Sequence, residues 1–418
     1  MELSREAYQL IVQNVGSRAD LCTLARVSRA FQRAAERALY NTILMKRPRA
    51  TVDLCNTLAA NVRLAVFVDA LTIFVQTESD KGGDEGDGEK DDEDEEESSK
   101  SSGADASGFP ANYWEGVSAA LRQMTRLRFF NLHVDGDAAY AWILRGCTFK
   151  LHSFHCDLVW DANLIEFLET QDQLLDLYLA DYVSPVTAAP TPQPEAGSRP
   201  QSLVPPPPSP QSSAPSSATI RASSLPALST LECSFIDAIT ALVPGRPVSR
   251  VKTCFSSADT PGKTAELRQL GASLRRATGA AAAHGRVYSL DLADSAYTED
   301  FSLVVLAELS RRLPELRYLG TLVLPVGLER LQFFGLLMRL RKLHTVELEV
   351  SEWEPAPTPQ ALRALASELR LYCSSIKCVV FVQDFERTVV RAINGFCAVD
   401  PEANADNLWR DVEIQHHI

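Results

Sequence analysis

The sequence of 418 residues lacks the short motifs that commonly mark an enzyme's active site. It contains no G-x-S-x-G, no G-x-G-x-x-G and no H-E-x-x-H. A "GKT" occurs at 262–264, but the first glycine of a phosphate-binding loop is missing before it. An α/β enzyme would need convergent polar groups that these residues do not supply. We therefore expect no enzymatic activity and no cofactor.

Long hydrophobic runs are also missing. The most apolar window, "LAVFVDALTIFV" at 64–75, is shorter than a membrane span of about 20 residues and carries Asp69. The opening "MELSREAYQL" has charges where a secretory signal would be apolar. These features predict a soluble protein of the cytoplasm or nucleus with no membrane partner.

Cysteine is present in a number that does not suit a disulfide framework, since nine is odd. Most of the cysteines stand among apolar residues, which is typical of reduced, buried thiols. His152, His155 and Cys156 lie close in sequence, but on a strand His155 would point away from the other two. Cys373 and Cys378 are five apart and do not have zinc-site spacing. We expect no metal site.

The negative charge is concentrated in one segment. The net charge is −13, yet residues 78–100 alone hold thirteen acidic residues against three lysines. The remainder is close to neutral, so nucleic acid is not an expected partner.

Two segments have compositions that do not support a packed core. Residues 78–108 continue the acidic run into "SSGADASG", and residues 183–224 hold about half of the 23 prolines. Both interrupt the chain internally, which is tolerated when they leave from surface loops. Proline-motif binding, phosphorylation at Ser209 or electrostatic steering are conceivable there, but solvated spacers are the simpler interpretation.

Outside these segments one pattern recurs: an apolar residue, two of any kind, an apolar residue, any residue, and an apolar residue. Its copies start at 68, 127, 151, 174, 228, 248, 287, 316, 343 and 376, for example "LRFFNL", "VYSLDL" and "LHTVEL". The alternation at the end of each copy favours a strand. Helix-like stretches such as "DANLIEFLETQDQ" and "PQALRALASELRLYC" lie between copies.

This alternation of strand and helix predicts an α/β fold, an irregular leucine-rich-repeat-like solenoid with a parallel sheet. The asparagine that follows each strand in regular repeats is replaced here, at Asp135, Val159, Tyr182, Ser295 and Ser351. The alternative is an ordinary doubly wound α/β domain.

The first forty residues divide into three short amphipathic helices. "SREAYQLIVQNV" has Ser4 as a possible cap, "DLCTLARV" has Asp20, and "SRAFQRAAERALY" has Ser28. A unit of this size cannot bury a self-sufficient core, so it must lean on the rest of the chain or on a partner.

At this point the chain resembles the F-box family, and its continuation resembles fungal F-box proteins with leucine-rich-repeat-like C-terminal regions. The family's apolar, acidic and aromatic positions are matched by Leu3, Glu6, Ile11, Val15, Asp20, Leu21, Leu24, Val27, Ser28, Phe31, Leu39 and Tyr40. Ser4 stands where proline is usual, and Phe31 where tryptophan is common. The implied organisation is an F-box at 1–45, repeats at 46–77, 109–182 and 225–418, and the two insertions at 78–108 and 183–224.

The resemblance implies the substrate-recognition subunit of a Skp–cullin–F-box ubiquitin ligase. The helices would dock a Skp-type adaptor, and through it a cullin, while the repeats hold an unidentified protein substrate. The expected adaptor-binding residues are Leu3, Ile11, Leu21, Leu24, Val27 and Phe31. The alternative is a leucine-rich-repeat scaffold whose N-terminal helices only cap the solenoid.

Substrate choice in such an array depends on the strand residues between the apolar ones, on the concave face. Strand alternation places seven candidates there: Arg128, His152, Asp176, Glu232, Lys252, Asp291 and Glu347.

Overall fold

The fold is that of a computed structural model. It describes residues 4–75, 110, 112–134, 139–180, 219–276, 287–293 and 297–410. The acidic segment 78–108, residues 183–218 of the proline-rich segment and Leu3 lie outside these ranges.

Thirteen strands form one sheet in which spatial order follows chain order. Neighbours from β1 to β11 are parallel, whereas β12 and β13 are antiparallel. A doubly wound domain would reverse its strand order at a switch point. The continuous order excludes that alternative and establishes an α/β solenoid of the leucine-rich-repeat type. The strands are β1 (Thr42–Met45), β2 (Ala70–Val75), β3 (Phe129–Val134), β4 (Ser153–Cys156), β5 (Asp176–Leu179), β6 (Thr230–Cys233), β7 (Arg250–Cys254), β8 (Ser289–Ala293), β9 (Tyr318–Val323), β10 (Thr345–Glu349), β11 (Cys378–Gln383), β12 (Glu386–Ile393) and β13 (Phe396–Val399).

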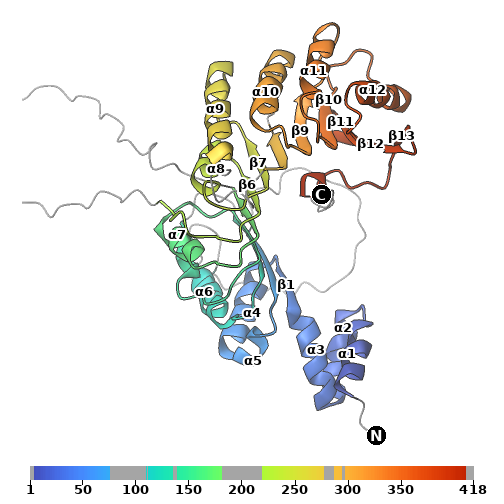
Figure 1. The fold of residues 1–418 in the computed structure, drawn as a ribbon. Helices are drawn as coiled ribbons and strands as arrows, with labels where there is room; N and C mark the ends of the chain where they lie inside the picture. Colours follow the sequence, from blue (N-terminus) through green and yellow to red (C-terminus); the bar gives the residue numbers. More distant parts are fainter. Residues whose placement is uncertain are drawn as a thin grey trace, which may run out of the picture.

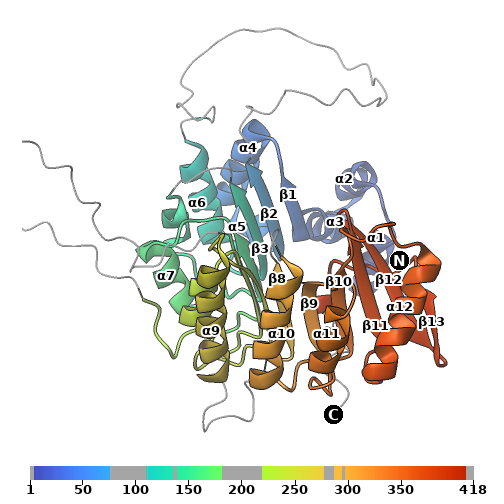
Figure 2. The ribbon, with the colours of Figure 1, turned by 90° about the horizontal axis from the view of Figure 1, so that it is seen from above.

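Helices cover one face of the sheet, which bends into an arc with these helices on its outer side (Figures 1 and 2). They are α4 (Pro48–Ala60), α5 (Val62–Ala65), α6 (Tyr113–Gln123), the 3-10 helix η2 (Ala141–Leu144), α7 (Ala162–Glu169), α8 (Ile236–Leu242), α9 (Thr260–Arg276), α10 (Glu299–Arg312), α11 (Glu329–Leu337) and α12 (Pro359–Tyr372). One continuous apolar core fills the space between sheet and helices. The opposite, concave face carries no layer of α-helices in the described ranges, and its later strands are covered instead by the last described part of the chain.

The recurring sequence pattern is confirmed as the unit of this architecture. Each of its ten copies yields a strand, β2 to β11, that begins two residues after the first apolar residue. That first residue lies in the turn before the strand and is at most 3% exposed in every copy: Val68, Leu127, Leu151, Leu174, Leu228, Val248, Val287, Leu316, Leu343 and Ile376. The later apolar pair points to the helices, so the polar residues between them face the concave side.

The two ends of the sheet depart from the pattern. β1 follows directly on a helix, and β12 and β13 form hairpins with tight turns. The second turn uses Asn394 (φ 52°) and Gly395 (φ 88°), the left-handed pair that two-residue hairpins prefer. The first uses Asp384 and Phe385, also at positive φ. The hairpins replace a further strand–helix repeat and end the parallel array.

The N-terminal helical unit consists of α1 (Arg5–Gln13), α2 (Arg18–Val27) and α3 (Arg29–Asn41). Ser4 and Ser28 cap α1 and α3 as expected, each accepting a backbone N–H three residues on. Helix α2 begins earlier than expected, because Ser17 rather than Asp20 is its cap.

This unit is attached to the solenoid through α3. Helix α3 runs directly into β1 and contacts α5, where Arg63 pairs with Glu36. The main contacts of α1 and α2 are with α3 itself. The unit lies beyond β1 at the N-terminal end of the arc (Figure 1), and among the described residues the main contacts of α1 and α2 leave their other sides uncovered.

Candidate functional site: the concave face and the N-terminal helical unit

Strand register places the concave residues in two rows. One row runs Ser153, Asp176, Thr230, Arg250, Ser289, Tyr318 and Thr345, from β4 to β10. The next runs Asn131, His155, Tyr178, Glu232, Lys252 and Asp291, from β3 to β8. Because parallel strands are about 4.8 Å apart, neighbours within a row are in direct reach.

Five of the seven predicted concave residues lie on this face: Asp176, Glu232, Lys252, Asp291 and Glu347. The other two, Arg128 and His152, require a correction because each stands in the turn just before a strand. Their carbonyls accept backbone N–H bonds from the next turn, at 2.8 Å for His152 N to Arg128 O. These two residues border the sheet's edge rather than line the concave face.

The half of the face near the C-terminus is buried under the last part of the chain. Glu347 is 3% exposed and accepts hydrogen bonds from Tyr318 Oη (3.0 Å), Thr321 Oγ1 (2.9 Å) and Arg387 Nε (3.1 Å). Burial alone would lower the pKa of Arg387, but the charge of Glu347 and bonds to Glu347 and Asp406 raise it. Burial and the nearby carboxylates raise the pKa of Tyr318 well above its usual value. Glu347 is therefore a structural residue here.

Asp291 is the last residue of the second row, on β8, and is buried beneath the same cover. Its carboxylate is 4.0 Å from Lys252 Nζ, and Lys252 is 3.4 Å from Glu232. Burial, followed by the charge of Glu347, raises the pKa of Asp291 to about 6, against the opposing effect of Lys252. One carboxylate oxygen of Asp291 is buried without a hydrogen-bond partner among the described residues.

Asp291→Asn should therefore stabilise the protein at high pH. The folded pKa of about 6 exceeds the ordinary 3.8, so the folded state binds the proton more tightly and wild-type stability falls as pH rises between these values. A shift of that size corresponds to about 3 kcal/mol. Chemical unfolding should show the variant more stable by about that amount at pH 8, and the difference should shrink to less than about 1 kcal/mol at pH 4. The exposed Asp172→Asn is the matched control, and a destabilised Asp291→Asn variant at pH 8 would contradict the argument.

The half of the face near the N-terminus is left uncovered by the residues that the structure describes. His133 stacks on Phe74 with ring centroids 4.8 Å apart, and its Nδ1 is 3.2 Å from Asp157. His155 Nε2 is 3.2 Å from Asp176, and its ring lies 5.8 Å from that of Tyr178. Aromatic rings beside carboxylates, partly exposed, form a surface suited to a cationic or aromatic side chain of another protein.

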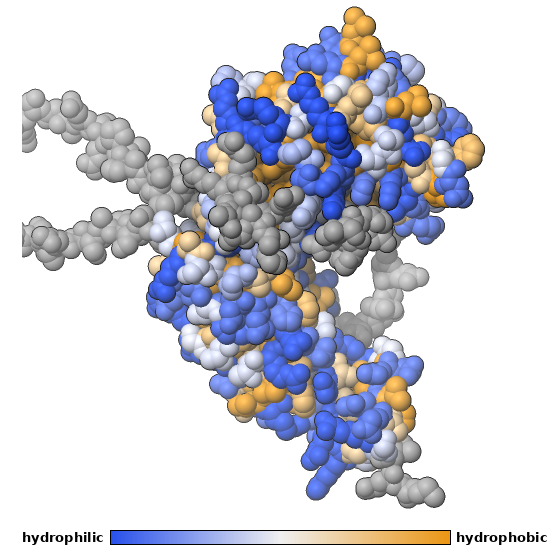
Figure 3. All heavy atoms as spheres, in the orientation of Figure 1, coloured by the Kyte–Doolittle hydropathy of each residue, from blue (hydrophilic) through white to orange (hydrophobic). Residues whose placement is uncertain are grey.

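The predicted adaptor-binding residues separate into a surface set and a core set. Ile11 (40% exposed) and Val27 (64%) face outward, together with Leu10 (60%). Leu21 was expected to contact the adaptor, but it is only 7% exposed. It packs with Val12 and Ala35 in the centre of the unit. Figure 3 shows apolar (orange) surface on this unit, at its edge away from the solenoid.

The remaining members lie between these extremes. Leu24 and Phe31 are half-buried at the margin of the same small core, and Phe31 meets the Tyr8 ring edge-on at 4.7 Å. Leu3 lies outside the described residues. Beside this margin, a groove of about 610 Å³ is lined by Arg5, Arg33, Arg37 and Arg63 as well as Tyr8, so the apolar surface adjoins a cationic one.

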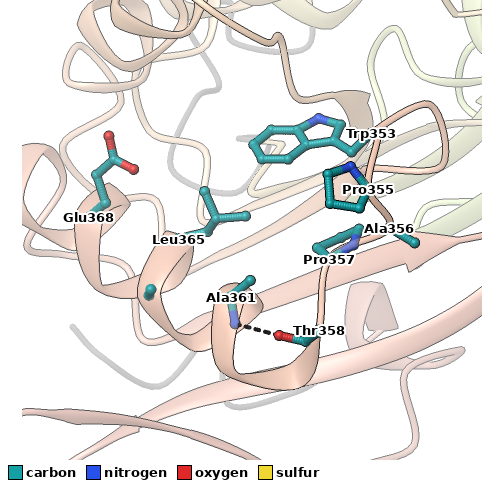
Figure 4. A pocket seen from close by; sticks show the side chains of 9 residues that line it. Trp353, Pro355, Ala356, Pro357, Thr358, Ala361, Leu365 and Glu368 are labelled. Atoms are coloured by element: carbon teal, nitrogen blue, oxygen red, sulfur yellow. Dashed lines mark hydrogen bonds between the residues drawn. The ribbon is translucent and has the colours of Figure 1, made fainter.

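A shallow hollow of about 450 Å³ lies on the convex side, between α12 and the loop before it (Figure 4). Trp353, Pro355, Ala361 and Leu365 line it, with Glu368 at one end. The Thr358 hydroxyl in this hollow accepts the Ala361 N–H and so caps α12. The lining lacks a nucleophile paired with a base.

Three further properties concern possible chemistry. The nine cysteines are free, and burial raises the pKa of Cys156 and Cys233 to about 12, which makes these thiols unreactive. Within the described ranges, no group of three or more His, Cys, Asp or Glu residues suits a metal ion. In the same ranges, no helix is both long and apolar enough to cross a bilayer.

Sequence reasoning missed the residues that cover the concave face. Arg387, Trp409 and Arg410 all bind across it, yet none belongs to the repeat pattern. A signal was present: "NLWR" places a tryptophan and an arginine in an otherwise polar, acidic stretch near the C-terminus. A large aromatic residue in such a stretch is typical of a segment that packs onto another part of the protein.

Comparison with known proteins gives a structural similarity at low sequence identity. No protein-family model matches it, and no curated protein matches it. Among solved structures, it is similar to an internalin from Listeria monocytogenes, at 12% sequence identity and a TM-score of 0.24. That match covers 64% of this chain and 63% of the internalin chain. The assignment to the leucine-rich-repeat type accordingly rests on the strand order, register and buried repeat positions described above.

Proposed function

We propose that this chain is a protein-binding subunit without catalysis of its own, the substrate receptor of a Skp–cullin–F-box type ubiquitin ligase. The N-terminal unit would act as an F-box that docks a Skp-type adaptor. The concave face would hold the protein substrate. The observation that carries the proposal is the outward display of Ile11 and Val27 on helices whose main contacts are with α3 alone.

The departures from the F-box pattern are compatible with this role. Ser4, in the place of the usual proline, begins α1 as an N-cap, with its hydroxyl 3.3 Å from Ala7 N. Phe31, in the place of a tryptophan, keeps an aromatic contact with Tyr8. Both substitutions retain the local structure that the helices need.

The alternative, a cap for the solenoid's end, would turn the apolar residues of α1 and α2 towards β1 and α4. Instead α3 alone provides the principal contacts with β1 and α5. A cap would also need a polar outer surface, whereas Leu10, Ile11 and Val27 are exposed there. The arrangement favours docking over capping.

The experiment is co-elution with a purified Skp-type adaptor in size-exclusion chromatography. We expect the wild-type chain to co-elute and an Ile11→Asp/Val27→Asp variant to lose the complex. Each buried aliphatic side chain contributes about 1.5–3 kcal/mol, so the pair should cost at least about 100-fold in affinity. Leu21→Asp is unsuitable, because it would unfold the unit's core.

The matched control is Val326→Asp/Leu328→Asp, which alters exposed apolar residues (51% and 81%) on the solenoid. This control should co-elute like the wild type, and circular dichroism should show all three proteins folded. If the wild type does not bind, or if the Ile11/Val27 variant binds equally well, the ligase role is lost and the capping scaffold remains.

A further inference from the structure

The last described segment of the chain lies along the concave face. Residues 400–410, here called the C-terminal strap, leave β13 with Asp400 N donating to Val389 O at 2.8 Å. The apolar strap residues Ala403, Ala405 and Leu408 then pack on Cys378, Val380 and Val389. The strap therefore crosses β11 and β12 and continues towards the middle of the sheet.

Trp409, in the 3-10 helix η3 (Leu408–Arg410), covers the centre of the face. It is 2% exposed, packs on Tyr318, and its carbonyl accepts a 2.7 Å hydrogen bond from Ser289 Oγ. The Lys252 ammonium lies 5.8 Å from its ring centroid. An aromatic side chain thus fills the site over β7, β8 and β9.

Arg410 ends the strap at the boundary between the covered and open halves. Its guanidinium donates to Asp176 Oδ2 and to Glu232 Oε2, each at 2.6 Å, and lies 4.6 Å from the Trp409 ring. Asp176 Oδ2 is also within 3.2 Å of His155 Nε2 on the open half. The contact with Asp176 joins residues 234 positions apart, and the contact with Glu232 joins residues 178 positions apart.

With the strap in place, the concave face still has carboxylate oxygens that can accept further hydrogen bonds. Buried oxygens of Asp176 and Asp291 have no hydrogen-bond partner among the described residues. Asp157, directly after β4, adds a carboxylate on the open half, beside His133. Several carboxylates around one position match a guanidinium, which has five N–H donors in a planar fork.

We propose that the concave face recognises an arginine next to an aromatic residue on its protein partner, and that the C-terminal strap occupies this site in cis until the partner displaces it. This inference deepens the proposed receptor function and rests on it. The strap already displays the required pair, Trp409 and Arg410, on the very residues predicted to contact substrate. A tethered segment has a high effective concentration, so it lowers the apparent affinity of any competitor.

The end of the strap is the part most easily released. Arg410, Asp176 and Glu232 retain 24%, 22% and 21% side-chain exposure, so their ion pairs are partly screened by solvent. Release of Arg410 would expose two carboxylates next to the aromatic residues of the open half. A partner's arginine could therefore enter there first.

The test uses the full-length chain and a fluorescently labelled peptide of its own residues 403–414. Fluorescence anisotropy should show the peptide binding to a Trp409→Ala/Arg410→Ala chain at least tenfold more tightly than to the wild type, whose site is occupied. Arg410→Ala alone should give a smaller gain in the same direction. This single variant removes only a partly exposed group and keeps the test valid if the double variant fails to fold.

Two controls define the site and the chemistry. Asp176→Asn/Glu232→Gln, added to the Arg410→Ala chain, should abolish peptide binding, whereas Asp172→Asn, at an exposed residue in the turn before β5, should not change it. A peptide with alanine in place of arginine should bind at least tenfold more weakly. Equal binding to the wild-type and Arg410→Ala chains, or binding indifferent to Asp176 and Glu232, would overturn the proposal. The assay contains no adaptor, so its failure is distinguishable from failure of the ligase role.

Discussion

Gly320→Ala should lower the free energy of unfolding by about 1–3 kcal/mol or more, as expected for overpacking in a close-packed region. A Cβ at this position of β9 would lie 2.0 Å from Asp291 Oδ1 and 2.8 Å from Asp291 Cα on the neighbouring strand. The side-chain oxygen could rotate, but the backbone of β8 cannot withdraw without disturbing its pairing. Urea unfolding followed by circular dichroism measures the loss.

Gly335→Ala provides the matched control. Gly335 lies inside α11, and a Cβ there would meet nothing within 4 Å. Alanine should therefore stabilise the protein by about 0.5–1 kcal/mol through its higher helix propensity. Opposite signs for the two substitutions would confirm the close approach of β8 and β9; an unchanged stability of the Gly320 variant would show that the two strands separate easily there.

The solenoid was predictable because its signal is local and repeated. Each copy of the pattern needs only six residues, and burial of the first apolar residue, such as Leu151 or Leu316, is imposed by the turn that every repeat shares. Helices α7 and α12 followed from their amphipathic spacing. A pattern that recurs ten times identifies its strands more reliably than one short strand could be identified alone.

The parts that were missed depend on contacts between distant residues. β1 has four residues and directly follows α3, so no spacing separates it from the helix. The pairing of Arg410 with Asp176 depends on tertiary geometry alone, because nothing local to either residue indicates it. The Asn394–Gly395 turn was a readable hairpin signal, but the alternation on either side does not follow the repeat pattern.

The residues of the candidate site were likewise predicted only where the local sequence determines their position. Strand alternation identified Asp176, Glu232 and Lys252 as concave, because a period of two fixes the face of a strand once one residue is placed. It misplaced Arg128 and His152 because the strands begin one residue later than the candidates. Alternation also gives no information about what covers a face, and so the burial of Glu347 had to come from the structure.

The two halves of the concave face differ in the burial of their strands. In β2 to β5 the concave residues are partly or fully exposed, whereas β10 is buried at four of its five positions. The strap contributes to this asymmetry by covering β8, β9, β11 and β12, while Arg387 of β12 covers Glu347 of β10; the last described strap residue, Arg410, lies at β5 and β6. A partner that binds the open half would meet the N-terminal repeats first, close to the helical unit.

Phe154→Ala should be among the most damaging single substitutions in the solenoid, at about 3–5 kcal/mol. Phe154 is fully buried on the helix-facing side of β4. Its ring stacks on Phe130 with centroids 5.6 Å apart and meets Phe167 of α7 edge-on at 5.7 Å. Alanine would leave a cavity between two consecutive strands and a helix, and the rigid aromatic neighbours could fill it only in part.

Phe129→Ala, one position from Phe130 on β3, is the matched control because Phe129 is 45% exposed on the concave side. It should cost less than about 1 kcal/mol. Repeats interact mainly with their neighbours, so the Phe154 cavity should loosen β3 to β5 before the C-terminal repeats unfold. Hydrogen exchange should then show faster amide exchange in 129–179 than in 345–383. Uniform acceleration along the whole chain would mean that the array unfolds as one cooperative unit.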